Sequence, residues 1–120
     1  MAQRGVNKAT LLGNIGNTPL IRYTPQQQPV AIFQVATGEY WKEEGTGKPK
    51  ERTDWHDIVV FNPTLAALVR DKAKQGMAIY LEGVMRKKQW KDDQGIDREK
   101  TEVIIDGFQG VIQLLSNKEV

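Results

Sequence analysis

Cysteine is absent from the 120-residue sequence, which excludes thiol catalysis, disulfide bonds and thiolate metal sites and agrees with a reducing compartment. Histidine occurs once, at position 56, so a histidine-based metal site or a catalytic triad would have no partner motif. No apolar run approaches the roughly 20 residues of a membrane span, and no signal peptide is recognisable. We therefore expect a soluble cytoplasmic protein that needs no cofactor or metal and is not an enzyme.

The sequence also lacks a large excess of either positive or negative charge. Seventeen Lys and Arg residues face fifteen Asp and Glu residues, which gives a net charge of +2 and a pI of about 8.9. This is only a mild bias toward polyanionic partners, so the clustering of basic residues matters more than their number.

Alternating polar and apolar residues, rich in β-branched and aromatic side chains, dominate the chain and predict strands. The first strand should bend or bulge at Gly13 and Gly16. Asn62 is a suitable N-cap and Pro63 a suitable first helical residue, so one short helix should follow and end at Gly76. The five predicted strands are residues 7–25, 29–41, 51–62, 77–90 and 97–108.

Three strands, one helix and two strands are the order of a five-stranded OB barrel, an all-β fold with its helix between the third and fourth strands. A small barrel of another type is the structural alternative. We expect one domain at residues 1–112 and a short C-terminal extension at 113–120, which has room for a last short strand.

The third predicted strand, "TDWHDIVVFN", is apolar on both faces. If Ile58 and Val60 point into the core, then Trp55, Val59 and Phe61 point outward. His56 shares the face of Ile58, which predicts a hydrogen-bonded histidine in the interior or at an interface.

Basic and aromatic side chains share one face of the fourth strand, at Arg86, Lys88 and Trp90. Single-stranded nucleic acid suits such a face, because cations follow the phosphates while flat rings stack on unpaired bases. A solvated strand with Trp90 at the barrel rim is the alternative interpretation. Trp41, at the end of the second strand, and Arg98, on the fifth, favour the nucleic-acid interpretation.

Two other motifs carry no chemistry. "GTGK" at 45–48 is not a phosphate-binding loop, because Pro49 replaces Ser or Thr and no helix follows. The acidic residues of the last hairpin lack the spacing of a calcium loop and predict a polar hairpin tip. They are Asp92, Asp93, Asp97 and Glu99.

The segments "RGVNKATLLGNIGNTP", "VATGEYW", "TDWHDIVVFN", "YLEGVMRKKQW" and "DREKTEV" resemble the bacterial single-stranded DNA-binding protein family over nearly all of residues 4–108. The resemblance implies an OB fold, a homotetramer, and binding of single-stranded DNA in replication, recombination and repair. It assigns base stacking to Trp41, Trp55, Phe61 and Trp90, and DNA backbone contacts to Arg4, Lys8, Arg86, Lys88 and Arg98. It assigns a subunit interface to His56 and Tyr80.

The sequence departs from that family at Thr18, Asp57 and Pro63, where acidic (Thr18) or basic (Asp57, Pro63) residues are usual, so local affinity should fall there. It also ends at "SNKEV" without the acidic-tipped tail that recruits replication and repair proteins. We therefore expect either a trimmed chain or a tail-less paralogue from a phage or plasmid. The rival hypothesis is a primosome-type OB adaptor that mainly binds other proteins.

Overall fold

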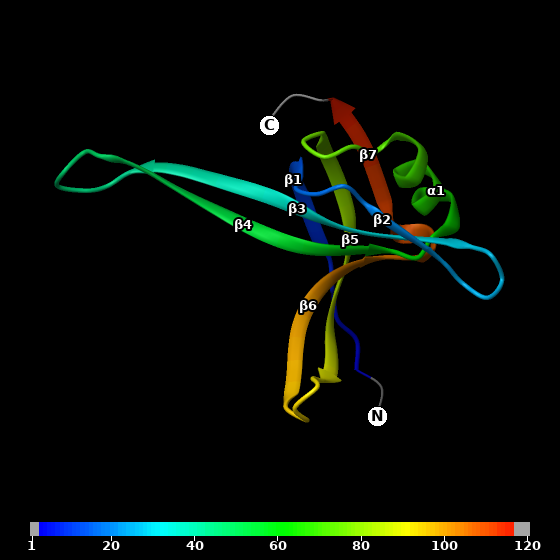
Figure 1. Cartoon of the computed structure of the whole chain (residues 1–120). Helices are drawn as coiled ribbons and strands as arrows, with labels where there is room; N and C mark the ends of the chain where they lie inside the picture. Colours follow the sequence, from blue (N-terminus) through cyan, green and yellow to red (C-terminus); the bar gives the residue numbers. More distant parts are fainter. Residues whose placement is uncertain (1–2, 117–120) are drawn as a thin grey trace.

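The computed structural model describes residues 3–116 and confirms the OB barrel, with one helix between its third and fourth long strands (Figure 1). The elements in chain order are β1 (Ala9–Ile15), β2 (Leu20–Tyr23), β3 (Pro29–Lys42), β4 (Pro49–Val60), α1 (Pro63–Lys72), β5 (Ala78–Lys91), β6 (Asp97–Ile105), the 3₁₀ turn η1 (Gly107–Gln109) and β7 (Val111–Ser116).

The barrel closes because the strands pair in the order β1, β3, β4, β6, β5, and β5 pairs back with β1. All of these pairs are antiparallel except β4 with β6, which is parallel. At the margins, β2 pairs with β3, and the last short strand, β7, pairs with β5. Closure leaves an inner face for the core and an outer face for ligands.

The first predicted strand divides into β1 and β2, and the break falls after Ile15. Gly13 does not break the strand. A Cβ at Gly13 would lie 2.2 Å from the carbonyl oxygen of Ala36, so glycine is needed for the close approach of β1 to β3. The bend is at Asn17, directly after Gly16, where the chain passes beneath the ring of Trp55.

Inward side chains alternate along each long strand, as the period of two requires. The largest fully buried ones include Phe33, Ile58, Ile79, Leu81 and Ile105. Helix α1 packs Ala66 and Val69 onto this core.

The helix begins as predicted but ends earlier. The side chain of Asn62 accepts a hydrogen bond from the backbone N–H of Leu65 at 3.1 Å, and Pro63 is the first helical residue. The last helical residue is Lys72, whereas Gly76, with a φ of 88°, lies in the turn that leads into β5. Gly76 is therefore a turn residue and not the helix stop that we expected.

Val59 also differs from expectation. It points to the outer face but is only 7% exposed. The register places it between Ile32 of β3 and Ile104 of β6, which continue to Leu20 of β2 and Val84 of β5. An apolar row, called here the outer row, therefore crosses the outside of the sheet and consists of Leu20, Ile32, Val59, Ile104 and Val84. The side chains on either side of Val59 in this row shield it from water.

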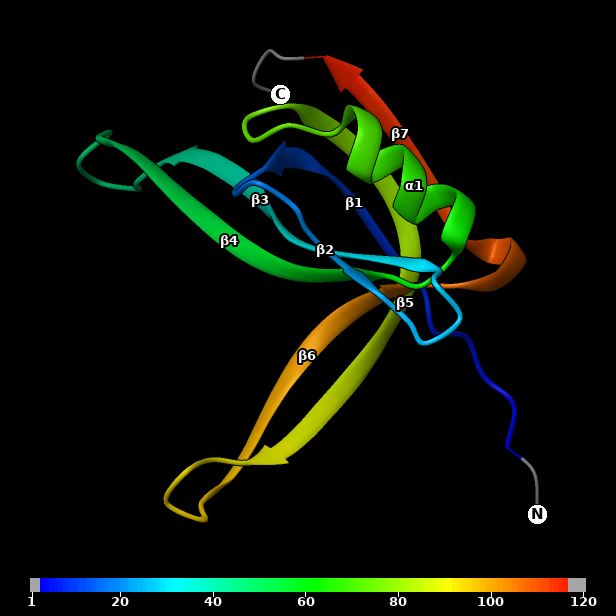
Figure 2. The same ribbon diagram turned by 45° about the vertical axis from the view of Figure 1, so that its right-hand side comes forward.

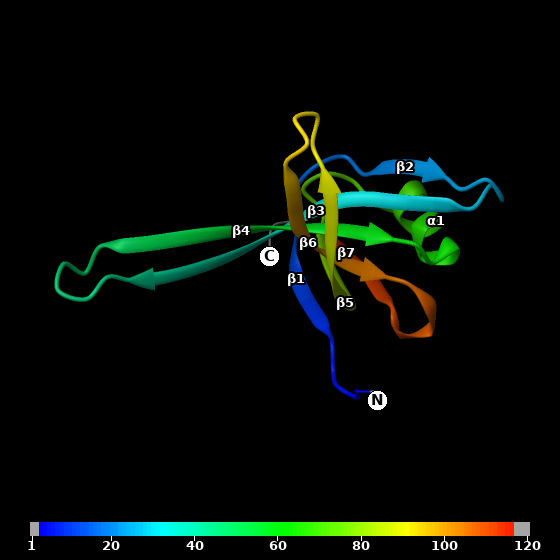
Figure 3. The same cartoon turned by 90° about the horizontal axis from the view of Figure 1, so that it is seen from below.

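Two hairpins extend well beyond the barrel in different directions, as Figures 2 and 3 show from two further sides. One is the end of the β3–β4 pair, called the β3–β4 arm, and the other is the end of the β5–β6 pair, called the β5–β6 arm. Among residues 3–116, no helix is long and apolar enough to cross a membrane.

Candidate nucleic-acid interface

Two aromatic rings flank the outer row on β4. Trp55 is 57% exposed on the strand, and Phe61 is exposed directly after it. The Trp55 ring lies against Gly16, since a Cβ there would be 2.4 Å from ring atom Cζ3. The sequence therefore positions one large flat surface toward solvent and supports it with a residue that has no side chain.

The β5–β6 arm has two chemically different faces. The register places Arg86 opposite Glu102, Lys88 opposite Lys100, and Trp90 opposite Arg98. Opposite residues in a strand pair lie on the same face. This face, called the cationic face, therefore holds four cations, one carboxylate and an indole, and it continues the outer side of the sheet that carries Trp55.

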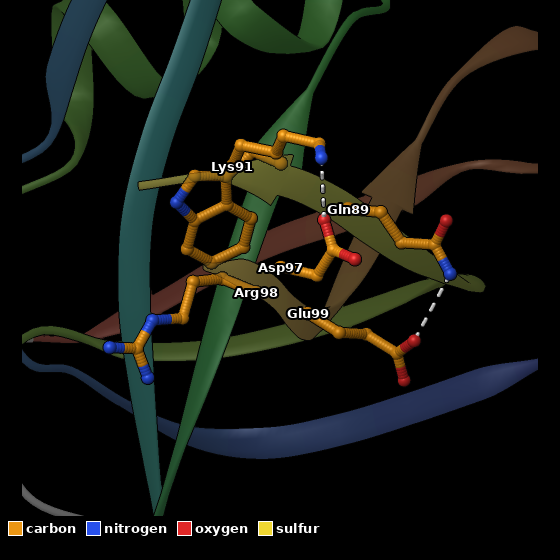
Figure 4. Close-up of a pocket in the computed structure, with 6 residues that line it drawn as sticks. Gln89, Lys91, Asp97, Arg98 and Glu99 are labelled. Atoms are coloured by element: carbon orange, nitrogen blue, oxygen red, sulfur yellow. Dashed lines mark hydrogen bonds and ion pairs between the residues drawn. The ribbon is translucent and has the colours of Figure 1, made fainter. Parts of the chain in front are cut away.

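Charges on the other face of the arm cancel. Lys87 pairs with Glu99 at 3.5 Å and Lys91 with Asp97 at 3.6 Å, while Gln89 donates a hydrogen bond to Glu99 at 3.1 Å. Figure 4 shows the contacts of Lys91 with Asp97 and of Gln89 with Glu99, with the guanidinium of Arg98 pointing away from Glu99. An anionic ligand is therefore attracted to only one side of the arm.

Arg98 is held in place by the hairpin tip. Its Nε donates to Asp92 at 2.9 Å. The backbone N–H of Ile96, the Arg98 side chain and the backbone N–H of Gln94 stabilise the carboxylate and hold the pKa of Asp92 below its usual range. The acidic hairpin tip therefore orients a cation beside Trp90.

Arg86 and Lys88 are exposed, and within residues 3–116 neither has an ion-pair partner. Lys100 pairs with Glu102 at 3.6 Å. Lys88 and Lys100 are like charges directly opposite one another, an arrangement that costs stability in a free sheet. A phosphate placed between the two lysines would relieve that repulsion.

Lys8 and Arg4 lie on the N-terminal segment, which runs beside β5, and Lys8 is next to Val84 and Ile104 of the outer row. The Asn7 amide exchanges two hydrogen bonds with the backbone of Met85, at 2.8 and 2.9 Å, which fixes this segment along β5. Lys8 forms an ion pair with Glu82 at 3.0 Å, and Arg4 is exposed.

The two predicted interface residues occupy different surfaces. His56 is half-buried at the mouth of the barrel, where its Nε2 is 2.9 Å from the hydroxyl of Thr37. Tyr80 is on the outer side of β5, opposite Leu12 of β1, which is exposed. Its hydroxyl donates to Glu82, which raises the pKa of Tyr80 and, together with Lys8, lowers the pKa of Glu82.

Trp41 lies apart from Trp55. Trp41 is opposite Lys50 and Trp55 is opposite Ala36, so the two rings are five positions apart along each strand, which is an odd offset. They consequently face opposite sides of the β3–β4 arm. The structure brings Trp55, Phe61, Trp90, Arg86, Lys88, Arg98 and Lys8 to one side of the sheet, whereas Trp41 faces the other side of the β3–β4 arm.

Two residues of this outer side were absent from the sequence prediction. Lys100 belongs to the cationic face, and Tyr40 shares the face of Trp55. Both residues could have been predicted from the hairpin register, because the register pairs each residue with one on the opposite strand.

Asp57 lies beside Glu102 in the centre of the outer side, where it accepts a hydrogen bond from Gln34 at 3.2 Å. These carboxylates make the centre of the surface acidic, whereas its cations gather on the β5–β6 arm.

A closed five-stranded barrel with rings and cations on its outer side defines an OB-type nucleic-acid-binding fold. The model of the Single-strand binding protein family matches residues 6–111, and the chain belongs to this family.

Individual proteins agree with this assignment. A single-stranded DNA-binding protein of Rhizobium meliloti (strain 1021) is 39% identical over 113 residues, which are 94% of this chain and 65% of that protein. The chain therefore spans about two thirds of that relative's length. A solved structure described as the Plasmodium falciparum SSB complex with ssDNA superposes with a TM-score of 0.90 at 29% identity, covering 97% of this chain and 100% of the other.

Proposed function

We propose that this chain binds single-stranded DNA without reading its sequence, as part of replication, recombination and repair. The observation that carries the proposal is the outer side of the sheet, where Trp55, Phe61 and Trp90 face solvent beside the cationic face. Exposed rings stack on any base, and cations follow any phosphate backbone. Family membership and the likeness to a solved complex with single-stranded DNA support it.

The same proposal assigns Trp41 to stacking and Arg4 and Lys8 to backbone contacts, as the family resemblance implies. Because Trp41 faces the other side of the β3–β4 arm from Trp55, the strand must pass around that arm to reach it. Wrapping of DNA around a homotetramer, with His56 and Tyr80 at subunit contacts, provides such a path.

The chain acts in this proposal as a binding protein and not as an enzyme, in the bacterial cytoplasm on the nucleoid. The primosome-type adaptor is the less favoured function, since an adaptor has no use for three rings exposed beside four cations.

Titration with poly(dT), followed by tryptophan fluorescence, tests the proposal. Stacking should quench the indoles, and Trp55→Ala or Trp90→Ala should weaken binding about five-fold to a hundred-fold, since stacking contributes roughly 1 to 3 kcal/mol per base. Circular dichroism of each variant controls for folding. Unquenched fluorescence with unchanged affinity in both variants would show that the rings are not a DNA platform.

A further inference from the structure

The β3–β4 arm carries a tyrosine that the family resemblance does not assign. Tyr40 is 81% exposed, more than any of the three tryptophans. The register places Ala36 opposite Trp55, Gly38 opposite Thr53, and Tyr40 opposite Glu51, so the Tyr40 ring lies on the same face of the arm as Trp55.

The surface between the two rings is made of small side chains. Ala36, Gly38 and Thr53 lie between Trp55 and Tyr40 in the register. A Cβ added at Gly38 would lie 3.9 Å from ring atom Cε2 of Tyr40, so the ring leans back over Gly38 toward the barrel. A larger residue at position 38 would occupy the space beneath the ring edge.

A groove is present at this place. It has a volume of about 290 Å³, and its lining includes Ala36, Gly38, Thr53 and Tyr40 from the arm and Leu12 and Asn14 from β1. The side chain of Asn14 donates to the carbonyl oxygen of Gly76 at 3.1 Å, which fixes the wall on the β1 side. Ala36, Gly38 and Thr53 give the groove a floor of small residues, and Tyr40 is the one aromatic side chain among the described residues that line it.

We propose that Tyr40 stacks one further base of the single strand, seated in this groove, and so extends the Trp55 platform outward along the β3–β4 arm. The inference rests on the proposed function, because it takes the ligand to be single-stranded nucleic acid. Three observations carry it: the exposure of the ring, its shared face with Trp55, and the groove with a floor of small residues. A flat, uncharged base matches that floor, whereas a bulky peptide side chain would have no deep pocket to fill.

Charge on this face of the arm adds little. Glu51 is opposite Tyr40, and Lys42 is two residues further along the same face, so their charges balance. Trp41 cannot replace Tyr40, since it faces the other side of the arm. The contribution of Tyr40 is therefore stacking, and it should be independent of salt.

The test is the affinity for poly(dT), measured by tryptophan fluorescence at several salt concentrations, for the full chain and three variants. Tyr40→Ala should weaken binding about five-fold to a hundred-fold, the range for stacking of one base, with the slope of log K against log salt unchanged. Tyr40→Phe should bind like the unmodified chain, because a phenyl ring also stacks. Tyr23→Ala is the matched control, since Tyr23 is a 53% exposed tyrosine on β2.

Three results would overturn the proposal. The first is an unchanged affinity in Tyr40→Ala under conditions in which Trp55→Ala binds more weakly, which leaves the proposed function intact. The second is an equal loss in Tyr23→Ala, and the third is a change in sedimentation that makes Tyr40 a subunit contact. If Trp55→Ala also binds normally and poly(dT) quenches no fluorescence, the proposed function fails together with the inference.

Discussion

At the scale of single residues, the orientation of Trp55 depends on a neighbour that has no side chain. The indole lies over Gly16, where the strand breaks between β1 and β2. The ring is thereby held against the sheet with one face free. A residue without a side chain thus determines how the ring meets a ligand.

Gly16→Ala should displace the Trp55 ring without unfolding the barrel. The added Cβ would be 2.4 Å from Cζ3, and the exposed indole can rotate away more easily than the backbone can move. We expect affinity for poly(dT) to fall several-fold, within the range for one stacked base, with a melting temperature close to that of the unmodified chain. Gly5→Ala, where an added Cβ has no atom within 4 Å, is the control. Equal affinity of the two variants would contradict the role of Gly16.

Sequence patterns predict the direction of a residue within its own strand, because successive side chains must alternate. Ile58 and Val60 are buried and Trp55 is exposed, as the alternation indicated. Contacts between strands cannot be predicted from this alternation. The shielding of Val59 by its neighbours and the pairing of Lys8 with Glu82 depend on which strands are adjacent, and periodicity does not contain that information.

At the scale of elements, the β5–β6 arm separates charge onto its two faces. On the cationic face, Lys88 and Lys100 lie directly opposite one another. On the other face, the charge of Lys87 is neutralised by Glu99. The sequence predicted Arg86, Lys88 and Trp90 as one face but missed Lys100, because its position follows from the hairpin register and not from the spacing on one strand.

Salt dependence should distinguish the two faces of the arm. Each phosphate contact contributes a slope of about −0.7 to log K against log salt for a single strand. Lys88→Ala and Lys100→Ala should each make the slope shallower by up to about that amount, while Lys87→Ala should leave it unchanged. The measurement is poly(dT) binding over a range of salt concentrations. A slope near zero for the unmodified chain, or an equal effect of Lys87→Ala, would remove the electrostatic part of the proposed function.

At the scale of the whole molecule, the order of strands and the place of the helix were predictable, because caps, glycines and changes of period mark the ends of elements. The end of α1 was not, since the chain leaves the helix at Lys72 before the glycine that serves as a turn. Assembly is a further property of this scale. The half-buried position of His56 at the barrel mouth, bonded to Thr37, is compatible with a neighbouring subunit there.

His56→Lys should dissociate a tetramer into smaller species at low micromolar concentration. A closed symmetric assembly would bury this charge once in every subunit, and an unpaired buried charge costs several kcal/mol. DNA binding should weaken as well, because wrapping needs several subunits. Sedimentation velocity at several concentrations measures the change, with Tyr23→Ala as a surface control. A monomeric unmodified chain, or a mutant that stays tetrameric, would place His56 outside the interface.

The parallel pairing of β4 with β6 has a consequence for the order of events during synthesis. Val59 and Ile104 are neighbours in the outer row but are far apart along the chain, and β1 must wait for β5 before the barrel closes. A chain still emerging from the ribosome can form the β3–β4 hairpin early, with Trp55 already in place on it. The surface that joins this ring to the cationic face does not exist until the residues of β6 have been made. Premature termination before β6 would therefore leave Trp55 of β4 and the cations of β5 at opposite edges of an open sheet, connected only through β3 and β1.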